Sequence, residues 1–141
     1  IVITHWKVGR HRDHRIASEL VRDACYLSGL KKIDLPSEPF RPEKLIYATA
    51  FREDADPPDF VVDITEQIER KLDVIALYTS QFDGVTSAGE VYPAGERPLL
   101  QQIRAKSAHY GSLIRARYGE PFRLDETMEV DEITELGVST F

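Results

Sequence analysis

The first thirty residues change from strand-like to helix-like spacing across one short polar stretch, and this change constrains the fold most. The run Ile1-Val2-Ile3-Thr4 has the apolar, β-branched character of a buried strand. Downstream, apolar residues recur at the spacing of one helical face: Ile16, Leu20, Val21, Ala24 and Leu27. Open α/β sheets bind their ligands at the carboxyl ends of such strands. The pattern therefore predicts a βα unit whose polar turn, residues 10–14, lies where these sheets carry chemistry.

The rest of the chain continues the alternation of strands and helices. We expect strands over residues 44–50, 60–62 and 120–124, and helices over residues 13–28, 64–80 and 99–117. Gly29 is expected to end the first helix at positive φ, and Gly119 to end the third. Asp63 is expected to cap the second helix, with Glu66 completing a capping box. A loop is expected over residues 83–95, and the fold class is α/β.

Composition excludes several classes of function. The 141 residues carry a net charge of −6, so they offer no basic surface for the phosphates of a nucleic acid. No apolar run approaches the roughly 20 residues of a membrane span. Cys25 is the only cysteine, which excludes an internal disulfide and fits a reducing cytoplasm. We therefore expect one cytoplasmic domain that acts on a small molecule, with no nucleic acid and no membrane as partner.

The polar turn reads Arg10-His11-Arg12-Asp13-His14. Two histidines three residues apart either share a metal ion on one helical face, or are solvated residues at the start of a helix that Asp13 caps. A carboxylate at position 13 is also placed to orient a neighbouring imidazole. Of the other histidines, His5 stands at the end of a strand and could approach the turn, but the neighbouring Trp6 favours a structural packing role. His109 is expected to lie on a helix surface. Spacing alone leaves both interpretations of the turn open.

This motif, with the helical sequence that follows it, resembles the second motif of the LmbE/PIG-L-like zinc deacetylases, which usually reads Arg-His-Pro-Asp-His. Three further segments resemble the same family in order: residues 58–65, 78–82 and 117–122. The similarity covers nearly the whole chain and is greatest to the bacillithiol-biosynthesis subgroup. Arg12 departs from the pattern, since the family has proline there, and we expect it to be a solvated surface charge.

The resemblance implies a zinc-dependent amide hydrolase that removes acetate from an N-acetylglucosamine unit carried on a small conjugate. It implies that His14 is a metal ligand and that His11 stabilises the oxyanion as a protonated imidazole. Asp13 would hold His11 in place, and Arg10 would contact the sugar substrate. The resemblance also implies part of a Rossmann-like, mostly parallel sheet flanked by helices, and a homo-oligomer.

In that family, the other zinc ligands and the general base come from an amino-terminal His-Pro-Asp-Asp motif, which this sequence lacks. We therefore expect residues 1–141 to be the carboxy-terminal portion of a single LmbE-like domain. Because a catalytic zinc site needs about three protein ligands, this portion alone is expected to be inactive. The alternative is a degenerate, non-catalytic relative that serves assembly or sugar binding, which Arg12 and the missing motif favour.

Overall fold

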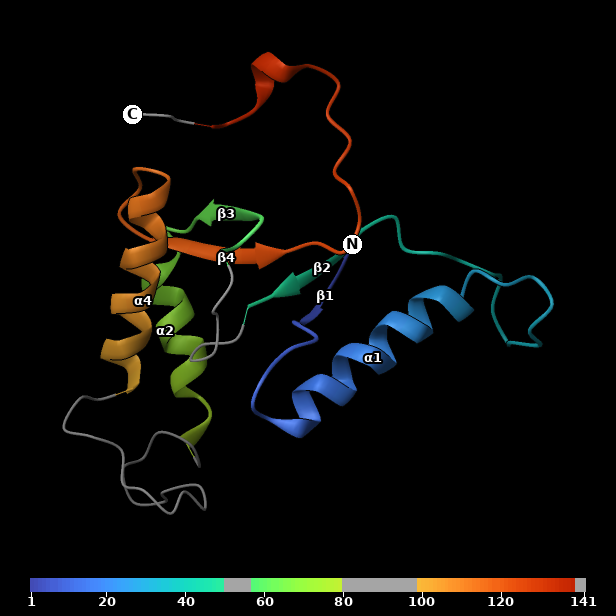
Figure 1. The fold of residues 1–141 in the computed structure, drawn as a ribbon. Coiled ribbons are helices and arrows are strands. Elements are labelled where there is room, and N and C mark those ends of the chain that lie inside the picture. The colour runs from blue at the N-terminus through green and yellow to red at the C-terminus, as the bar shows by residue number, and fades with distance from the viewer. Residues whose placement is uncertain (50–56, 80–98, 139–141) are drawn as a thin grey trace. The chain divides into compact units, whose positions relative to one another are not determined.

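The computed structural model describes residues 1–49, 57–79 and 99–138, so the predicted loop over residues 83–95 lies outside the described residues. The elements follow in the order β1 (Val2–His5), α1 (Arg12–Leu27), β2 (Leu45–Ala48), β3 (Phe60–Asp63), α2 (Ile68–Ala76), α4 (Leu99–Leu113), β4 (Gly119–Arg123) and a 3-10 helix, η1 (Ile133–Glu135) (Figure 1). The four strands form one sheet in the order β1-β2-β4-β3. The predicted α/β class is confirmed. None of the helices within the described ranges combines the length and the apolarity needed to cross a bilayer.

Two compact units make up the chain, and the first comprises residues 1–60 and 121–137. In it, β1 and β2 pair in parallel, from Val2 opposite Leu45 to His5 opposite Ala48. Parallel neighbours require a crossover connection, and α1 lies within that connection. Strand β4 pairs with β2 in the antiparallel direction. The carboxyl end of β1 therefore opens directly into the polar turn that precedes α1.

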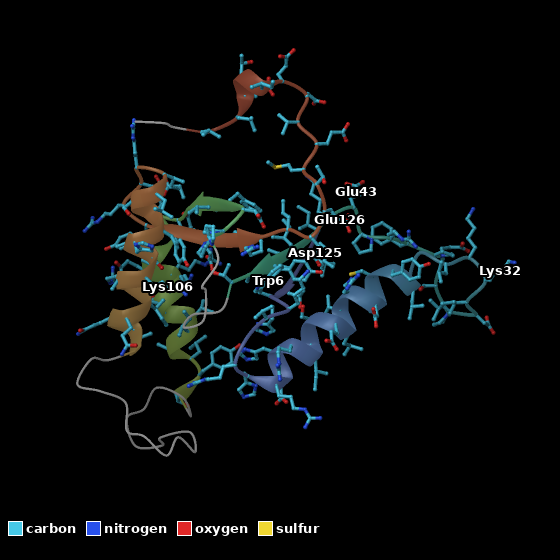
Figure 2. The ribbon with its side chains drawn as sticks, viewed as in Figure 1. Trp6, Lys32, Glu43, Lys106, Asp125 and Glu126 are labelled. Carbon is cyan, nitrogen blue, oxygen red and sulfur yellow. The ribbon has the colours of Figure 1, made fainter. Side chains whose placement is uncertain are left out.

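Tyr47 on β2 is the most buried large side chain of this unit, with 2% of its surface exposed. The ring of Trp6 packs edge-on against it, with the ring centroids 5.3 Å apart. The Tyr47 hydroxyl is hydrogen-bonded to Asp125, and burial, followed by the effects of this carboxylate, raises the pKa of Tyr47 to about 12. Asp125 also pairs with Lys7, and Figure 2 shows Trp6 and Asp125 beside the strands. The residues after β4 are thus bonded to the loop that follows β1.

Helix α1 begins and ends one residue earlier than predicted, and its carboxyl end differs in detail. The C-cap is Ser28 in the right-handed helical region, and the predicted positive φ of Gly29 is not present. The reason for a glycine is spatial, because a Cβ on Gly29 would lie 2.6 Å from Nε of Arg41. Close packing against a side chain, and not backbone conformation, therefore explains this glycine.

The second unit, which includes residues 61–120, contains the main apolar core of the described chain. Helices α2 and α4 pack side by side in it (Figure 1). The buried core residues are Ile64, Ile68, Leu72 and Tyr118, with Leu100 and Ile103 packed against them. Gly119 allows β4 to approach this core, because a Cβ there would lie 2.5 Å from Cγ1 of Val61.

Three predictions in this second unit are wrong at the ends of elements. The Asp63 carboxylate accepts a hydrogen bond from the backbone N–H of Thr65 at 2.8 Å, which caps a turn. The hydrogen bond with the Thr65 side chain, and then this backbone bond, lower the pKa of Asp63. Helix α2 begins only after that turn, with Gln67 as its N-cap. Helix α4 ends at Leu113, and Gly119 is the first residue of β4 instead of a helix terminator. At Asp63, a local polar contact overrode the apolar spacing from which the longer helix was predicted.

Candidate functional site

The turn between β1 and α1 brings the predicted site residues to the amino-terminal end of a helix. His11 is the N-cap of α1, with an extended backbone at φ −78° and ψ 119°. Its Nδ1 accepts a hydrogen bond from the backbone N–H of Asp13 at 3.2 Å. Asp13 lies in the first helical turn, where its negative charge interacts favourably with the helix dipole. The histidine, and not the aspartate, therefore caps the helix.

The hydrogen bond from Asp13 has a consequence for the protonation of His11. An imidazole nitrogen that accepts a hydrogen bond carries no proton, so Nε2 carries the proton of the neutral ring. The ring is then a donor at Nε2.

His14 is the common member of two ring pairs. Its ring centroid lies 4.7 Å from that of His11, with the planes 29° apart. The ring of His5 is closer, with a centroid distance of 4.2 Å and the planes 2° apart. Burial, and then the charge of His14, lower the pKa of His5. The structure thus brings together three histidines, of which His5 was expected to have only a structural role.

The position of His5 at the end of a strand indicated that it could approach the turn, whereas the neighbouring Trp6 favoured a packing role. His5 and Trp6 are neighbours in sequence, yet the indole packs on Tyr47 whereas the imidazole meets His14. Successive residues of an extended chain point in opposite directions, so the two rings cannot be treated as one packing group. The last residue of a strand that opens into a polar turn is also placed to face that turn.

The predicted substrate contact, Arg10, lies on a hollow beside the turn. This hollow has a volume of about 410 Å³ and is lined by Lys7, Val8, Gly9, Arg10 and Arg15. Three of the five lining residues are cationic. Arg12 does not line it and is exposed at the first position of α1, which agrees with a solvated surface charge.

The donor chemistry of the turn fits zinc only in part. His14 is exposed and offers an imidazole nitrogen, a common zinc ligand. Throughout the described ranges, no three His, Cys, Asp or Glu side chains are grouped so that they could hold a metal ion. In the turn, the stack keeps His5 and His14 from binding one ion together, because an imidazole lone pair lies in the plane of its ring and parallel rings do not direct their lone pairs at one point. The described residues therefore do not make up a complete catalytic zinc site, which takes about three protein ligands.

Two solved structures are similar to this chain in fold and in sequence. The conserved protein TT1542 from Thermus thermophilus is 28% identical in sequence, with a TM-score of 0.73 over 91% of this chain and 52% of its own. The N,N'-diacetylchitobiose deacetylase from Pyrococcus horikoshii is also 28% identical, with a TM-score of 0.59 over 86% of this chain and 43% of its own. No family model matches the sequence.

The chain spans about half the length of these two structures. The second is a deacetylase of the LmbE/PIG-L type, and it is similar to this chain in both fold and sequence. The comparisons therefore support the LmbE/PIG-L-like superfamily that the Arg10–His14 motif predicted.

Proposed function

We propose that this chain acts as the carboxy-terminal part of a zinc-dependent hydrolase that removes the acetyl group from an N-acetylglucosaminyl conjugate, such as a bacillithiol precursor. The observation that carries the proposal is the similarity to the diacetylchitobiose deacetylase, which extends over 86% of the chain. The turn of β1 and α1 supports it, because this turn holds His11, Asp13 and His14 together. The preceding part of the polypeptide would supply the remaining metal ligands and the general base.

Four residues of the turn have a role in this proposal, and Arg12 has none. His14 provides one imidazole nitrogen to the metal site, and zinc, when bound, supplies the Lewis acidity that activates water and polarises the acetyl carbonyl. His11 donates a hydrogen bond to the carbonyl oxygen as negative charge develops on it. Its Nε2–H is the available donor, since Nδ1 is occupied by the backbone of Asp13. Asp13 is a positioning residue for His11, and Arg10 binds the substrate from the neighbouring hollow.

The test uses the complete protein and compares His14→Ala with His11→Ala. Zinc content is measured by mass spectrometry, and acetate release is measured on a panel of N-acetylglucosaminyl conjugates. We expect His14→Ala to lose both zinc and activity. We expect His11→Ala to keep its zinc and to lose turnover by on the order of a hundredfold or more, as for the loss of one oxyanion donor.

His109→Ala is the matched control, since His109 is an exposed histidine on α4 outside the turn. It should change neither zinc content nor turnover. Retention of both zinc and acetate release by His14→Ala would overturn the proposal. A complete wild-type protein that binds the sugar conjugates without cleaving them would instead indicate a non-catalytic relative.

A further inference from the structure

We infer that His5 is a positioning residue for His14, which it holds by ring stacking so that the His14 imidazole keeps one orientation. The inference rests on the proposed function, in which His14 binds the metal ion. It adds a residue that lies outside the Arg10–His14 motif. The carrying observation is the near-parallel stack, with centroids 4.2 Å apart and planes 2° apart.

Ring orientation matters for a metal ligand because the imidazole lone pair lies in the plane of the ring. Rotation of that plane swings the lone pair away from its target, and the partners that fix the rings of metal-binding histidines therefore influence metal affinity. A flat ring stacked at 4.2 Å resists such rotation, since a turned ring would meet its neighbour edge-on. The His5 ring thus restricts His14 without contributing a metal ligand.

The position of His5 is well restrained because its backbone belongs to the sheet. It is the last residue of β1 and lies opposite Ala48 in the parallel pair with β2. The next backbone N–H, that of Trp6, donates to the carbonyl oxygen of Ala48 at 3.0 Å. The backbone at His5 is therefore held against β2.

The other neighbour, His11, restricts His14 less. Its ring is farther away, at 4.7 Å, and is inclined by 29°. Its proposed role also requires it to respond to substrate, whereas His5 has no such requirement. The two neighbours thus have different functions: His5 orients the ligand, and His11 donates to the substrate.

The first experiment measures zinc affinity of the complete protein by competition with a chelator. We expect His5→Ala to weaken zinc binding by about 10- to 100-fold, the range typical for residues that orient a metal ligand. His5→Phe keeps a flat ring and removes both nitrogens, so it should restore affinity to within a few-fold of wild type. The exposed His109→Ala serves again as the control.

The outcomes separate this inference from the proposed function. If His14→Ala weakens zinc binding and His5→Ala does not, the inference on His5 is wrong while the proposed function stands. If His5→Phe is as defective as His5→Ala, the stack is not the cause and the inference is overturned. If His14→Ala itself leaves zinc affinity unchanged, the proposed function fails.

A second experiment needs no metal and no substrate. The carbon-bound ring protons of His14 are followed by NMR in the metal-free complete protein, with and without His5→Ala. Loss of the stacked ring should shift the His14 resonances, whereas those of His109 should stay in place. Unchanged His14 resonances would overturn the stack directly. Thermal melting of each variant, expected near the wild-type midpoint, distinguishes positioning from a general loss of structure.

Discussion

The two units of the chain are stabilised in different ways. The unit of residues 61–120 buries a cluster of four apolar side chains between its helices and the start of β4. In the unit that carries the candidate site, Tyr47 and Ser18 are the buried side chains among the described residues. There, aromatic and ionic contacts such as Trp6 on Tyr47 and Lys7 with Asp125 hold the elements together.

The difference teaches where chemistry can be placed at low structural cost. Hydrophobic packing in a core is non-directional, and a polar side chain buried there without a hydrogen-bond partner is costly. Directional contacts between aromatic and charged side chains can instead surround a solvent-exposed turn. Helix α1 also leaves large apolar side chains exposed, including Leu20 at 67%. The candidate site therefore lies in the unit whose own hydrophobic stabilisation is smaller.

The largest expected effect comes from the core of the second unit. Ile68 is 3% exposed, so Ile68→Ala should lower the free energy of unfolding by about 2–5 kcal/mol. Leu20→Ala on α1 removes a similar volume at an exposed site and should change it by less than about 0.5 kcal/mol. Urea denaturation measures both. Equal losses in the free energy of unfolding would contradict the difference in hydrophobic stabilisation between the two units.

Removal of the Tyr47 hydroxyl should give the next largest effect. The hydroxyl is bonded to a carboxylate, that of Asp125, and hydrogen bonds to charged groups contribute about 1.5–3 kcal/mol. Tyr47→Phe should lower the free energy of unfolding by an amount in this range. A loss of only a few tenths of a kcal/mol would show that this unit does not depend on the directional contact.

The pH dependence should have opposite signs for two of the buried tyrosines, Tyr47 and Tyr118. The folded pKa of Tyr47 is raised from 10.0 to about 12, so its contribution is present below pH 10 and is lost as the pH rises through about 12. The hydrogen bond with Arg104 lowers the pKa of Tyr118, so its contribution is present above pH 10 and is lost as the pH falls through the folded pKa.

Ultraviolet titration of tyrosinate checks both signs. Tyr47→Phe should remove a group that ionises late, and Tyr118→Phe one that ionises early. Identical difference curves for the two variants would contradict the assignment of the two environments.

A smaller loss is expected at Gly119. A Cβ there would lie 2.5 Å from Cγ1 of Val61 and 2.8 Å from the backbone nitrogen of Gly111, so Gly119→Ala should cost about 1–3 kcal/mol. Gly137→Ala is the matched control, because nothing lies within 4 Å of the added atom. Chemical denaturation of both variants tests whether the tight packing around Gly119 contributes to stability, and equal losses would contradict it.

The smallest effect is a gain, at the residue that departs from the family motif. Arg12 is the first residue of α1, where proline is favoured, and His11 before it is extended, as proline requires. Arg12→Pro should raise the free energy of unfolding by about 0.4–1 kcal/mol. Arg15→Pro is the contrasting variant, since its backbone N–H donates to His11, and it should be strongly destabilising. Thermal melting distinguishes the two.

The βα turn could be predicted from the sequence because the apolar residues change from strand-like to helix-like spacing within one short segment. Strand β1, helix α1 and strands β3 and β4 lie close to their predicted bounds. The errors at Gly29, Asp63 and Gly119 arose where a tertiary approach or a turn hydrogen bond decided the geometry. Such contacts depend on residues distant in sequence, which apolar spacing does not report.

The candidate site was predictable in its motif and not in its surroundings. His11, Asp13 and His14 are contiguous, so one turn holds them whatever the rest of the chain does. The stack of His5 on His14 depends on the direction in which the side chain of the last residue of β1 points. The capping bond to His11 likewise depends on where the helix begins, which sequence reasoning predicted one residue too late.

The bond between Asp125 and Lys7 links sequence positions 118 residues apart. Shortening the chain after Arg123 would remove Asp125, and with it one anchor of Lys7 and the carboxylate partner of Tyr47. Removal of the residues after β4 would therefore loosen the segment around Lys7, just ahead of the histidine turn. In protein engineering, the residues after β4 are best kept together with the unit that carries this turn.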